Sequence, residues 1–328
     1  MITRTSTLSM NKLVTNQLLS VQNKYNTLQQ QILTNTKVSK ASDDPAAASK
    51  IALTKSQLSE YTMYSRSITS ANLQLNSMES SLAQVTSRMQ RANELITEAS
   101  NEISTLESIK PIKSELKEIL KTIVTLSNAQ VDGQYIFSGA NTTTPAYKID
   151  DNGNVIYQGS NITTDGTTRE LEISDGVYVP LNQAGDSIFG EYKVTKDADD
   201  NDVVTSSGII GSIKTAIKAM EGIPKDATDP TSELIVDYKT IRNQIDVIKN
   251  EINEVSTVRA QFGSYAQRIE MTQNSIDENK IIAEERRAGL QDIDIVEALS
   301  QLAQQQYALQ ASMQITSNML SNSLLNYL

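Results

Sequence analysis

The sequence predicts a mainly α-helical protein with a β-rich insertion: long antiparallel coiled-coil rods, paired N- and C-terminal helices, and one central β domain. Apolar residues recur at intervals of three and four over long stretches on both sides of the middle, a spacing typical of coiled coils. Glycine is absent before Gly133, and ten of the 13 glycines lie from there to Gly211, which indicates a different structure in the middle. Aromatic residues make up only 5% of the chain and Trp is absent, so we do not expect a large globular core.

The first element is a predicted helix with one apolar face between Asn11 and Leu33. The apolar positions of this face are spaced four, three, four, three and four: Val14, Leu18, Val21, Tyr25, Leu28 and Ile32. This spacing predicts a coiled-coil seam, which we expect to be part of an assembly interface.

A second, long helix is predicted to begin after Asp44. Asp44 suits the N-cap, Pro45 suits the first helical position, and Asp43 favours the positive end of the helix. From Tyr61 to Leu106 the apolar spacing has no polar member, so a rod longer than roughly 80 Å is expected, and Pro111 is expected to end it. A shorter helix behind that proline is predicted from Ile112, Leu116, Ile119, Ile123 and Leu126.

The glycine-rich middle contains at least two predicted β-hairpins. Residues 147–149 and 155–157 alternate around the turn Asp151-Asn152-Gly153, and residues 171–173 and 177–179 alternate around Asp175-Gly176. The acidic cluster from Asp197 to Asp202 lacks the Gly and the distal Glu of an EF-hand loop, so a solvated turn is the preferred interpretation over a calcium site.

After the β part, residues 208–222 are predicted to hold a short helix, and a second rod follows. The rod is indicated by apolar residues that again step by four and three: Leu234, Tyr238, Ile241, Ile245, Ile248, Ile252, Val255, Phe262, Ala266, Ile269 and Ile276. Two rods on either side of an insertion pair most simply antiparallel, which places the two terminal helices together.

The C-terminal helix has no charged residue from Ala298 onward and still has an apolar face. Its predicted seam residues, with Gln306 and Thr316 in the two gaps of the register, are Ile295, Leu299, Leu302, Leu309, Met313 and Leu320, followed by Leu324 and Leu325. Because its opposite face is polar without being ionic, we expect this helix to pack against other helices, including copies of itself.

Composition excludes several classes of function. Cys and His are absent, which removes thiol nucleophiles, His-based catalysis and nearly all zinc and haem sites, so we expect neither an enzyme nor a cofactor or metal site. The net charge of −10 disfavours nucleic acid as a partner. No segment has the apolar run of a signal peptide or a membrane span, so membrane insertion is not expected either.

Several motifs resemble the bacterial flagellin superfamily. Residues 35–51, NTKVSKASDDPAAASKI, resemble a turn of that superfamily, and residues 291–328 resemble its C-terminal helix. Within the superfamily, a D-G-x-Y-x-F-x-G pattern and the ending Ser323–Leu328 resemble hook-filament junction proteins rather than filament flagellins; the pattern contains Gly133, Tyr135, Phe137 and Gly139. One departure is Thr36, where the family usually has Gly before the Lys of the turn.

The resemblance implies a structural adaptor of the extracellular bacterial flagellum, exported through the type III channel without a cleaved signal peptide. It implies a homo-oligomeric ring that contacts an adjacent hook-associated junction protein and flagellin, and an export chaperone on the C-terminal helix. Residues 1–42 and 291–328 would form the inner helical polymerisation domain. Residues 43–131 would be the outgoing rod, 132–206 the outer β-rich domain, and 207–290 the short helix and returning rod.

Two alternatives stay open at this point. The first is a short filament flagellin that polymerises by itself, which would share the fold and the location. The second is a secretion-system tip protein or a helical-hairpin receptor. The missing membrane span argues against the receptor.

Overall fold

The computed structural model describes residues 2–101, 106–150, 153–160, 169–181, 183–196, 202–224 and 234–325. Contacts divide the chain into two units: a terminal unit, residues 1–62 and 277–328, and a central unit, residues 63–276. The described strands all fall in the central unit, and long helices occur in both, so the predicted fold class is confirmed. Within the described residues, no helix combines the length and the apolarity needed to cross a membrane.

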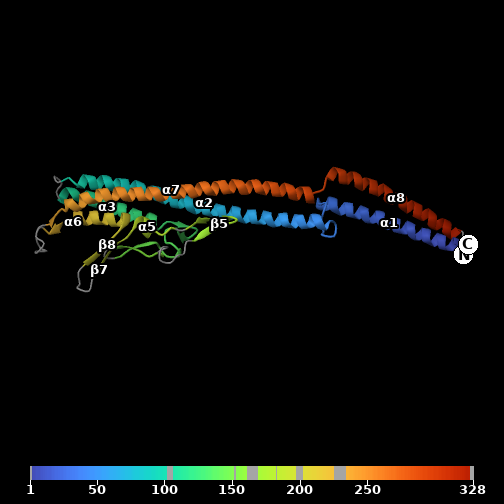
Figure 1. Ribbon diagram of the computed structural model, residues 1–328, viewed down its shortest axis with the longest axis horizontal. Helices are drawn as coiled ribbons and strands as arrows, with labels where there is room; N and C mark the ends of the chain where they lie inside the picture. The colour runs from blue at the N-terminus through green and yellow to red at the C-terminus, as the bar shows by residue number, and fades with distance from the viewer. Residues whose placement is uncertain are drawn as a thin grey trace. The chain divides into compact units, whose positions relative to one another are not determined.

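Helices account for most of the described chain (Figure 1). They are α1 (Ile2–Thr34), α2 (Pro45–Ala99), α3 (Leu106–Ser127), α5 (Asp186–Phe189), α6 (Gly208–Glu221), α7 (Tyr238–Gln291) and α8 (Ile295–Leu325). The helices predicted at both termini, after Asp44, near Ile112, at 208–222 and in the returning rod are therefore all present. Leu234, which was assigned to the returning rod, lies instead in a short strand.

The outgoing helix ends earlier than predicted. α2 stops at Ala99, where the Ser100 hydroxyl donates to the Thr97 carbonyl at 2.7 Å and so competes with the continuing helix. Ile103 lies outside the described residues, and Leu106 begins α3. Pro111 therefore does not end the helix but lies inside α3, where it removes one backbone donor close to the helix start.

In the central unit, α2 and α7 pack along a heptad seam. The buried residues of α7 recur at every seventh position and are at most 5% exposed: Ile241, Ile248, Val255, Phe262, Ile269 and Ile276. A strict seven-residue repeat is the pattern of a left-handed helix pair. Arg259 of α7 pairs with Glu79 of α2 at 2.6 Å, and residues 263–274 line one groove with residues 68–76. Residues later in α7 thus contact residues earlier in α2, so the two helices are antiparallel, as predicted.

The strands of the described residues form one four-stranded antiparallel sheet and three two-stranded pairs. The sheet has the order β3 (Tyr147–Ile149), β4 (Val155–Tyr157), β7 (Tyr192–Lys196) and β8 (Asp202–Ser206). The pairs are β1 (Gln130–Val131) with β2 (Gln134–Tyr135), β5 (Glu170–Ser174) with β6 (Val177–Pro180), and β9 (Ile223–Pro224) with β10 (Leu234–Ile235). Both predicted hairpins are confirmed, since Tyr147 pairs with Tyr157 and Leu171 with Val179. The residues from Asp197 to Asp200 lie outside the described residues.

Aromatic side chains form the core beneath this sheet. Phe137 and Phe189 meet edge to face with ring centroids 5.1 Å apart, and Tyr147 lies 6.0 Å from Phe189. The Tyr147 hydroxyl donates to the Gly190 carbonyl at 2.9 Å, and burial raises the pKa of this tyrosine. The buried Tyr147 hydroxyl is therefore satisfied by a hydrogen bond, as buried tyrosines usually require, whereas the buried hydroxyl of Tyr192 in β7 has no such partner among the described residues.

Candidate assembly interface

The terminal unit is built on the pairing of α1 with α8, which run side by side with both ends of the chain at the same end of the pair (Figure 1). The predicted seam of α1 is the face that this pairing covers, because all six of its residues are half-buried while the residues between them, except Gln31, are exposed: Val14, Leu18, Val21, Tyr25, Leu28 and Ile32. Sequence spacing therefore identified the pairing face of α1 correctly.

The pairing face of α8 differs from the predicted seam. The covered residues that step by four and three are Ala298, Leu302, Gln305, Leu309, Ser312 and Thr316, and Ala308 is also half-buried. Leu302, Leu309 and Thr316 belong to the predicted register, whereas the other covered positions do not. Ile295, Leu299 and Met313 lie to one side of this face with exposed fractions of 47%, 51% and 49%. The side chains of Leu320, Leu324 and Leu325 lie outside the described residues.

The physical reason is the size of the side chains. Small residues such as Ala298 and Ser312 let two helices approach closely, because interaxial distance follows the side chains at the contact. A rule that counts only large apolar residues misses such a face. Ala298, Gln305 and Ser312 could have been found from their shared spacing with Leu302 and Leu309.

Large apolar side chains remain uncovered on both helices of this pair. On α1, Leu13 and Leu33 are 67% and 80% exposed, and on α8, Val296 and Tyr307 are 80% and 72% exposed. These exposed apolar side chains make the pair a candidate surface for association. The residues predicted to form an assembly interface are therefore only partly covered within one chain.

The turn after α1 is closed by Asn35, which has a φ of 51°. The Asn35 amide donates to the Ile32 carbonyl at 3.3 Å, and the Thr36 amide donates to the Gln31 carbonyl at 3.0 Å. These two bonds form a Schellman motif with Asn in the left-handed position. Asn35, not Thr36, adopts the left-handed backbone of this turn, so Thr36 fits at the position where the family usually has Gly.

The start of α2 has the cap that the sequence predicts. The Asp44 carboxylate accepts from the amides of Ala46 and Ala47 at 3.0 and 2.9 Å, and α2 begins at Pro45. Asp43 differs from its predicted role, because its carboxylate accepts from the amides of Ser39 and Lys40, at 3.1 and 2.8 Å, instead of lying at the helix end. Asp43 thus holds the turn and Asp44 holds the helix.

In the terminal unit, the connection between α1 and α2 is hydrogen-bonded to the connection between α7 and α8. Thr36 and Asp292 form an antiparallel bridge, and the Lys37 amide donates to the Gln291 carbonyl at 2.6 Å. A small apolar cluster of Val38, Ala47 and Ile51 packs against Leu290 beside this bridge. Asp294 then caps α8 by accepting from the amides of Val296 and Glu297, at 2.9 and 3.1 Å. The backbone of one connection therefore fixes the other.

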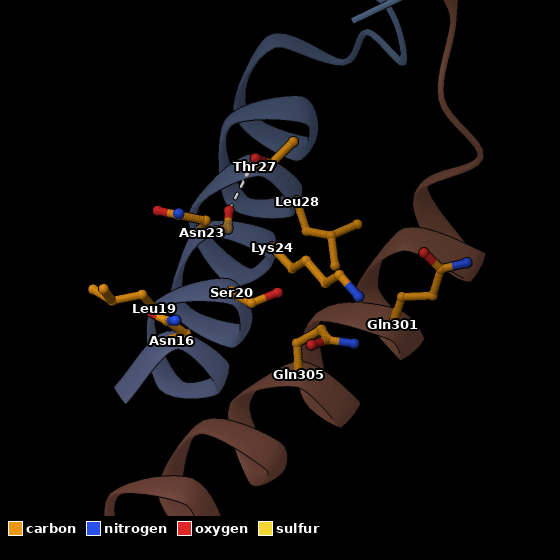
Figure 2. A pocket seen from close by; sticks show the side chains of 9 residues that line it. All are labelled: Asn16, Leu19, Ser20, Asn23, Lys24, Thr27, Leu28, Gln301 and Gln305. Atoms are coloured by element: carbon orange, nitrogen blue, oxygen red, sulfur yellow. Dashed lines mark hydrogen bonds between the residues drawn. The ribbon is translucent and has the colours of Figure 1, made fainter. Parts of the chain in front are cut away.

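A hollow of about 660 Å³ lies along the α1–α8 pair, and Figure 2 shows the side chains that line it. The lining is made of amide, hydroxyl and leucine side chains, with one charged residue, Lys24: Asn16, Leu19, Ser20, Asn23, Lys24, Thr27, Leu28, Gln301 and Gln305. This lining is more polar than that of a typical small-molecule pocket.

The residues of the D-G-x-Y-x-F-x-G pattern lie in the central unit and have structural roles there. Asp132 and Gly133 both have positive φ, 51° and 75°, and form the turn between β1 and β2. Tyr135 lies in β2 and is half-buried, and Phe137 is fully buried. Gly139 has a φ of 65°, and a Cβ there would clash with the Ser160 carbonyl oxygen. The pattern thus positions the start of the β-rich part and takes no part in the α1–α8 pair.

No chemistry beyond association is apparent at the α1–α8 pair. In the described part of the chain, no three acidic side chains come close enough together to hold a metal ion. What the arrangement offers is a charge-poor pair of helices with uncovered apolar side chains.

Comparison with known proteins identifies relatives along most of the chain. Residues 5–142 match the bacterial flagellin N-terminal helical region, and residues 245–328 match the bacterial flagellin C-terminal helical region. Flagellar hook-associated protein 3 of Escherichia coli is 25% identical over 300 residues, and that of Salmonella typhimurium is 26% identical over 302 residues. Each match covers 90% of this chain and 90% of the relative.

Solved structures share the fold at lower identity. A flagellar hook-associated protein from Vibrio parahaemolyticus has a TM-score of 0.60 at 18% identity, covering 76% of this chain and 100% of that chain. The flagellar junction protein FlgL from Legionella pneumophila has a TM-score of 0.55 at 14% identity, covering 74% and 100%. FlgL from Bacillus cereus has a TM-score of 0.54 at 19% identity, covering 72% and 99%.

Proposed function

This chain belongs to the bacterial flagellin family, and on that premise we propose that it is a structural junction protein of the bacterial flagellum, joining the hook side to the flagellin filament. Both curated relatives described above are hook-associated proteins 3, which supports the junction role over that of a short filament flagellin. The proposal is for a structural protein rather than an enzyme, and the absence of Cys and His from the sequence supports it.

One observation carries the mechanism: the α1–α8 pair leaves large apolar side chains uncovered. The seam residues of α1 are only half-buried, whereas Ile241, Ile248 and Val255 of α7 are at most 1% exposed. Two helices alone bury little apolar surface, so they gain stability when further helices cover them. Copies of this chain would supply that cover by packing their α1–α8 pairs together as a ring.

In this mechanism the ring has two rims with different neighbours. One rim would meet the adjacent hook-associated junction protein, and the other would receive flagellin. Val14 to Ile32 of α1 would hold the pair together, while Ile295, Leu299 and Met313 of α8, exposed in the single chain, would contact neighbouring copies. The side chains of Leu320, Leu324 and Leu325 would extend that contact. Residues 1–42 and 291–328 would thus form the inner polymerisation domain.

Export would precede assembly. A chain without Cys passes unfolded through a narrow channel without forming disulfides, and helices with local contacts refold rapidly afterwards. Until then the apolar side chains of α8 would need a chaperone to keep them from premature association. The final location would be extracellular, without a cleaved signal peptide.

The experiment that tests this function removes the gene and then locates the protein. Cells lacking it should secrete flagellin into the medium but build no filament, and antibody label on complemented cells should mark one band between hook and filament. Label along the whole filament, or micrometre filaments formed by the purified protein alone, would instead identify a filament flagellin. Normal filaments in the deletion strain would reject the junction role.

A further inference from the structure

A cluster of lysine side chains lies in the central unit, where α6 packs against α3 and β7 (Figure 1). Lys214 and Lys218 are four residues apart on α6, so their side chains leave the same face of the helix with Cβ atoms about 5–6 Å apart. Their ammonium nitrogens lie 5.7 and 5.9 Å from the ring centroid of Tyr192 in β7. One aromatic ring therefore attracts two positive charges to the same place.

Two further parts of the chain border this cluster. A Cβ atom on Gly153, in the turn between β3 and β4, would lie 3.1 Å from the Lys214 ammonium nitrogen, so the backbone of this turn passes close to the charge. On the other side, Lys117 of α3 forms an ion pair with Glu221 of α6 at 2.9 Å. Lysines of two different helices thus gather around one part of the surface.

The charges of Lys214 and Lys218 are not neutralised by an ion pair. Within the described residues, neither ammonium group has a carboxylate within ion-pair distance. Glu221 is engaged by the lysine of α3. The carboxylate of Asp150, which also acts on Lys214, accepts from the backbone and side-chain amides of Asn154 at 2.7 and 2.8 Å. Two ammonium groups therefore face outward with their charges uncompensated at close range.

The pKa of the half-buried Lys214 reflects this surplus of positive charge. Burial lowers its pKa, and the charges of Lys117 and Lys218 lower it as well. Glu221 and Asp150 act in the opposite direction without cancelling the effect. The whole chain has a net charge of −10, so a positive surface of this kind is a local feature. A bound anion would offset the repulsion among the ammonium groups.

We propose that Lys214 and Lys218 bind a phosphate group, with Lys117 at the edge of the site. Two ammonium groups match a phosphate, which carries a charge of about −1.5 to −2 at neutral pH, better than they match a single carboxylate. Lysines bind phosphate as point charges, which suits two flexible side chains that leave one helix. Inorganic phosphate and a phosphate monoester share this chemistry. The site lies within the central unit of one chain, so binding requires no assembly and goes beyond the junction role.

Isothermal titration calorimetry of the full-length protein with sodium phosphate, at neutral pH and constant ionic strength, tests the site. We expect saturable binding at one site per chain. Lys214→Gln and Lys218→Gln should each weaken binding about tenfold, since each removes one charge-assisted hydrogen bond to the anion. Lys121→Gln is the matched control and should bind like wild type, because this exposed lysine one turn after Lys117 pairs within its own helix.

Glu221→Gln should change the affinity in the opposite direction. It removes a negative charge at the edge of the site and releases Lys117, so phosphate should bind about threefold more tightly. Sodium acetate should bind about tenfold more weakly than phosphate to the wild-type protein, because it carries a single charge. Methyl phosphate identifies the source of the ligand: tighter binding than inorganic phosphate indicates a monoester, and equal or weaker binding indicates the free ion.

Several results would overturn the site. They are the absence of saturable phosphate binding by the wild-type protein, unchanged affinity in both lysine variants, weaker binding by Glu221→Gln, and equal affinities for acetate and phosphate. Unfolding midpoints of the variants without phosphate should match wild type, so that a change in affinity reports on the site and not on the fold. These measurements use the isolated protein, so their failure would leave the junction role intact.

Discussion

At the scale of single residues, Glu251 of α7 is the group whose charge state the fold alters in the physiological range. Burial, together with the negative charge of Glu254, raises the pKa of this carboxyl to about 7 from its usual 4.5. An acid with a raised pKa stabilises the fold while it is protonated, so its contribution is present below pH 4.5 and is lost as the pH rises through 7. At pH 8 the Glu251 carboxylate is charged, and its partial burial lowers the free energy of unfolding.

Glu251→Gln should therefore make unfolding harder only at the higher pH. We expect the free energy of unfolding to rise by about 1–2 kcal/mol at pH 8, after allowance for solvent screening of a partly exposed group, and to change little at pH 4.5. Urea unfolding followed by circular dichroism at both pH values measures the difference. Glu278→Gln, at an exposed position of the same helix, should show neither effect, and an equal gain at both pH values would contradict the assignment.

Asn35 carries a second prediction at this scale, because its left-handed backbone closes the first turn. Asn35→Ala should weaken the turn by about 1 kcal/mol, since Ala tolerates positive φ less well than Asn. Amide hydrogen exchange at residues 35 and 36 should then quicken about fivefold, provided these amides exchange by local opening. Asn35→Gly should keep or improve protection, and slower exchange in the Ala variant would argue against the motif.

At the scale of elements, adjacent residues of α7 differ in burial according to whether they belong to its heptad seam. Ile248 is fully buried, whereas Val247 beside it is 39% exposed. Ile248→Ala should lower the free energy of unfolding by about 2–5 kcal/mol through the cavity it leaves, and Val247→Ala by less than about 1 kcal/mol. Urea midpoints of the two variants measure this contrast. Similar losses at both positions would mean that the seam lies elsewhere on the helix.

The elements also show which parts of the interface the sequence could predict. The seam of α1 was predictable because its covered positions are all large and apolar, from Val14 to Ile32. The covered face of α8 was predicted only in part, since Leu302, Leu309 and Thr316 fall in the predicted register but Gln305 and Ser312 look like surface residues when only hydrophobicity is counted. The end of α2 was assigned to Pro111, but the break depends on the hydrogen bonds of Ser100, for which apolar spacing gives no signal.

At the scale of the whole molecule, the order of helices and hairpins was predictable because local patterns determine both. The turns at Gly153 and Gly176 mark hairpins through backbone geometry that each sequence stretch specifies by itself. The antiparallel pairing of the two rods was predictable from their order in the chain, but the individual long-range contacts were not. The bridge between Thr36 and Asp292, and the pairing of Arg259 with Glu79, join residues far apart in the chain that no local pattern connects.

The division into two units leads to a prediction about the whole chain. The central unit, residues 63–276, contains the buried seam of α2 and α7 and the core around Phe137, and none of these depends on residues after 300. A chain truncated after Ser300 should therefore keep a folded central unit, because the contacts that stabilise it remain. The terminal unit should lose most of its helical pair, since Leu302 and Leu309 of the covered face are removed.

The truncated chain should be a soluble, helical, β-containing monomer that does not join flagella. Near-ultraviolet circular dichroism, which reports on the tyrosines of the β-rich part, should match wild type, while the far-ultraviolet helical signal falls. Full-length Leu302→Asp with Leu309→Asp is the matched variant and should also stay out of flagella, because burying two carboxylates between helices is unfavourable. Filament growth in cells that carry either variant would refute the role given to α8. Loss of the near-ultraviolet signal on truncation would instead show that the central unit needs the terminal helices to fold.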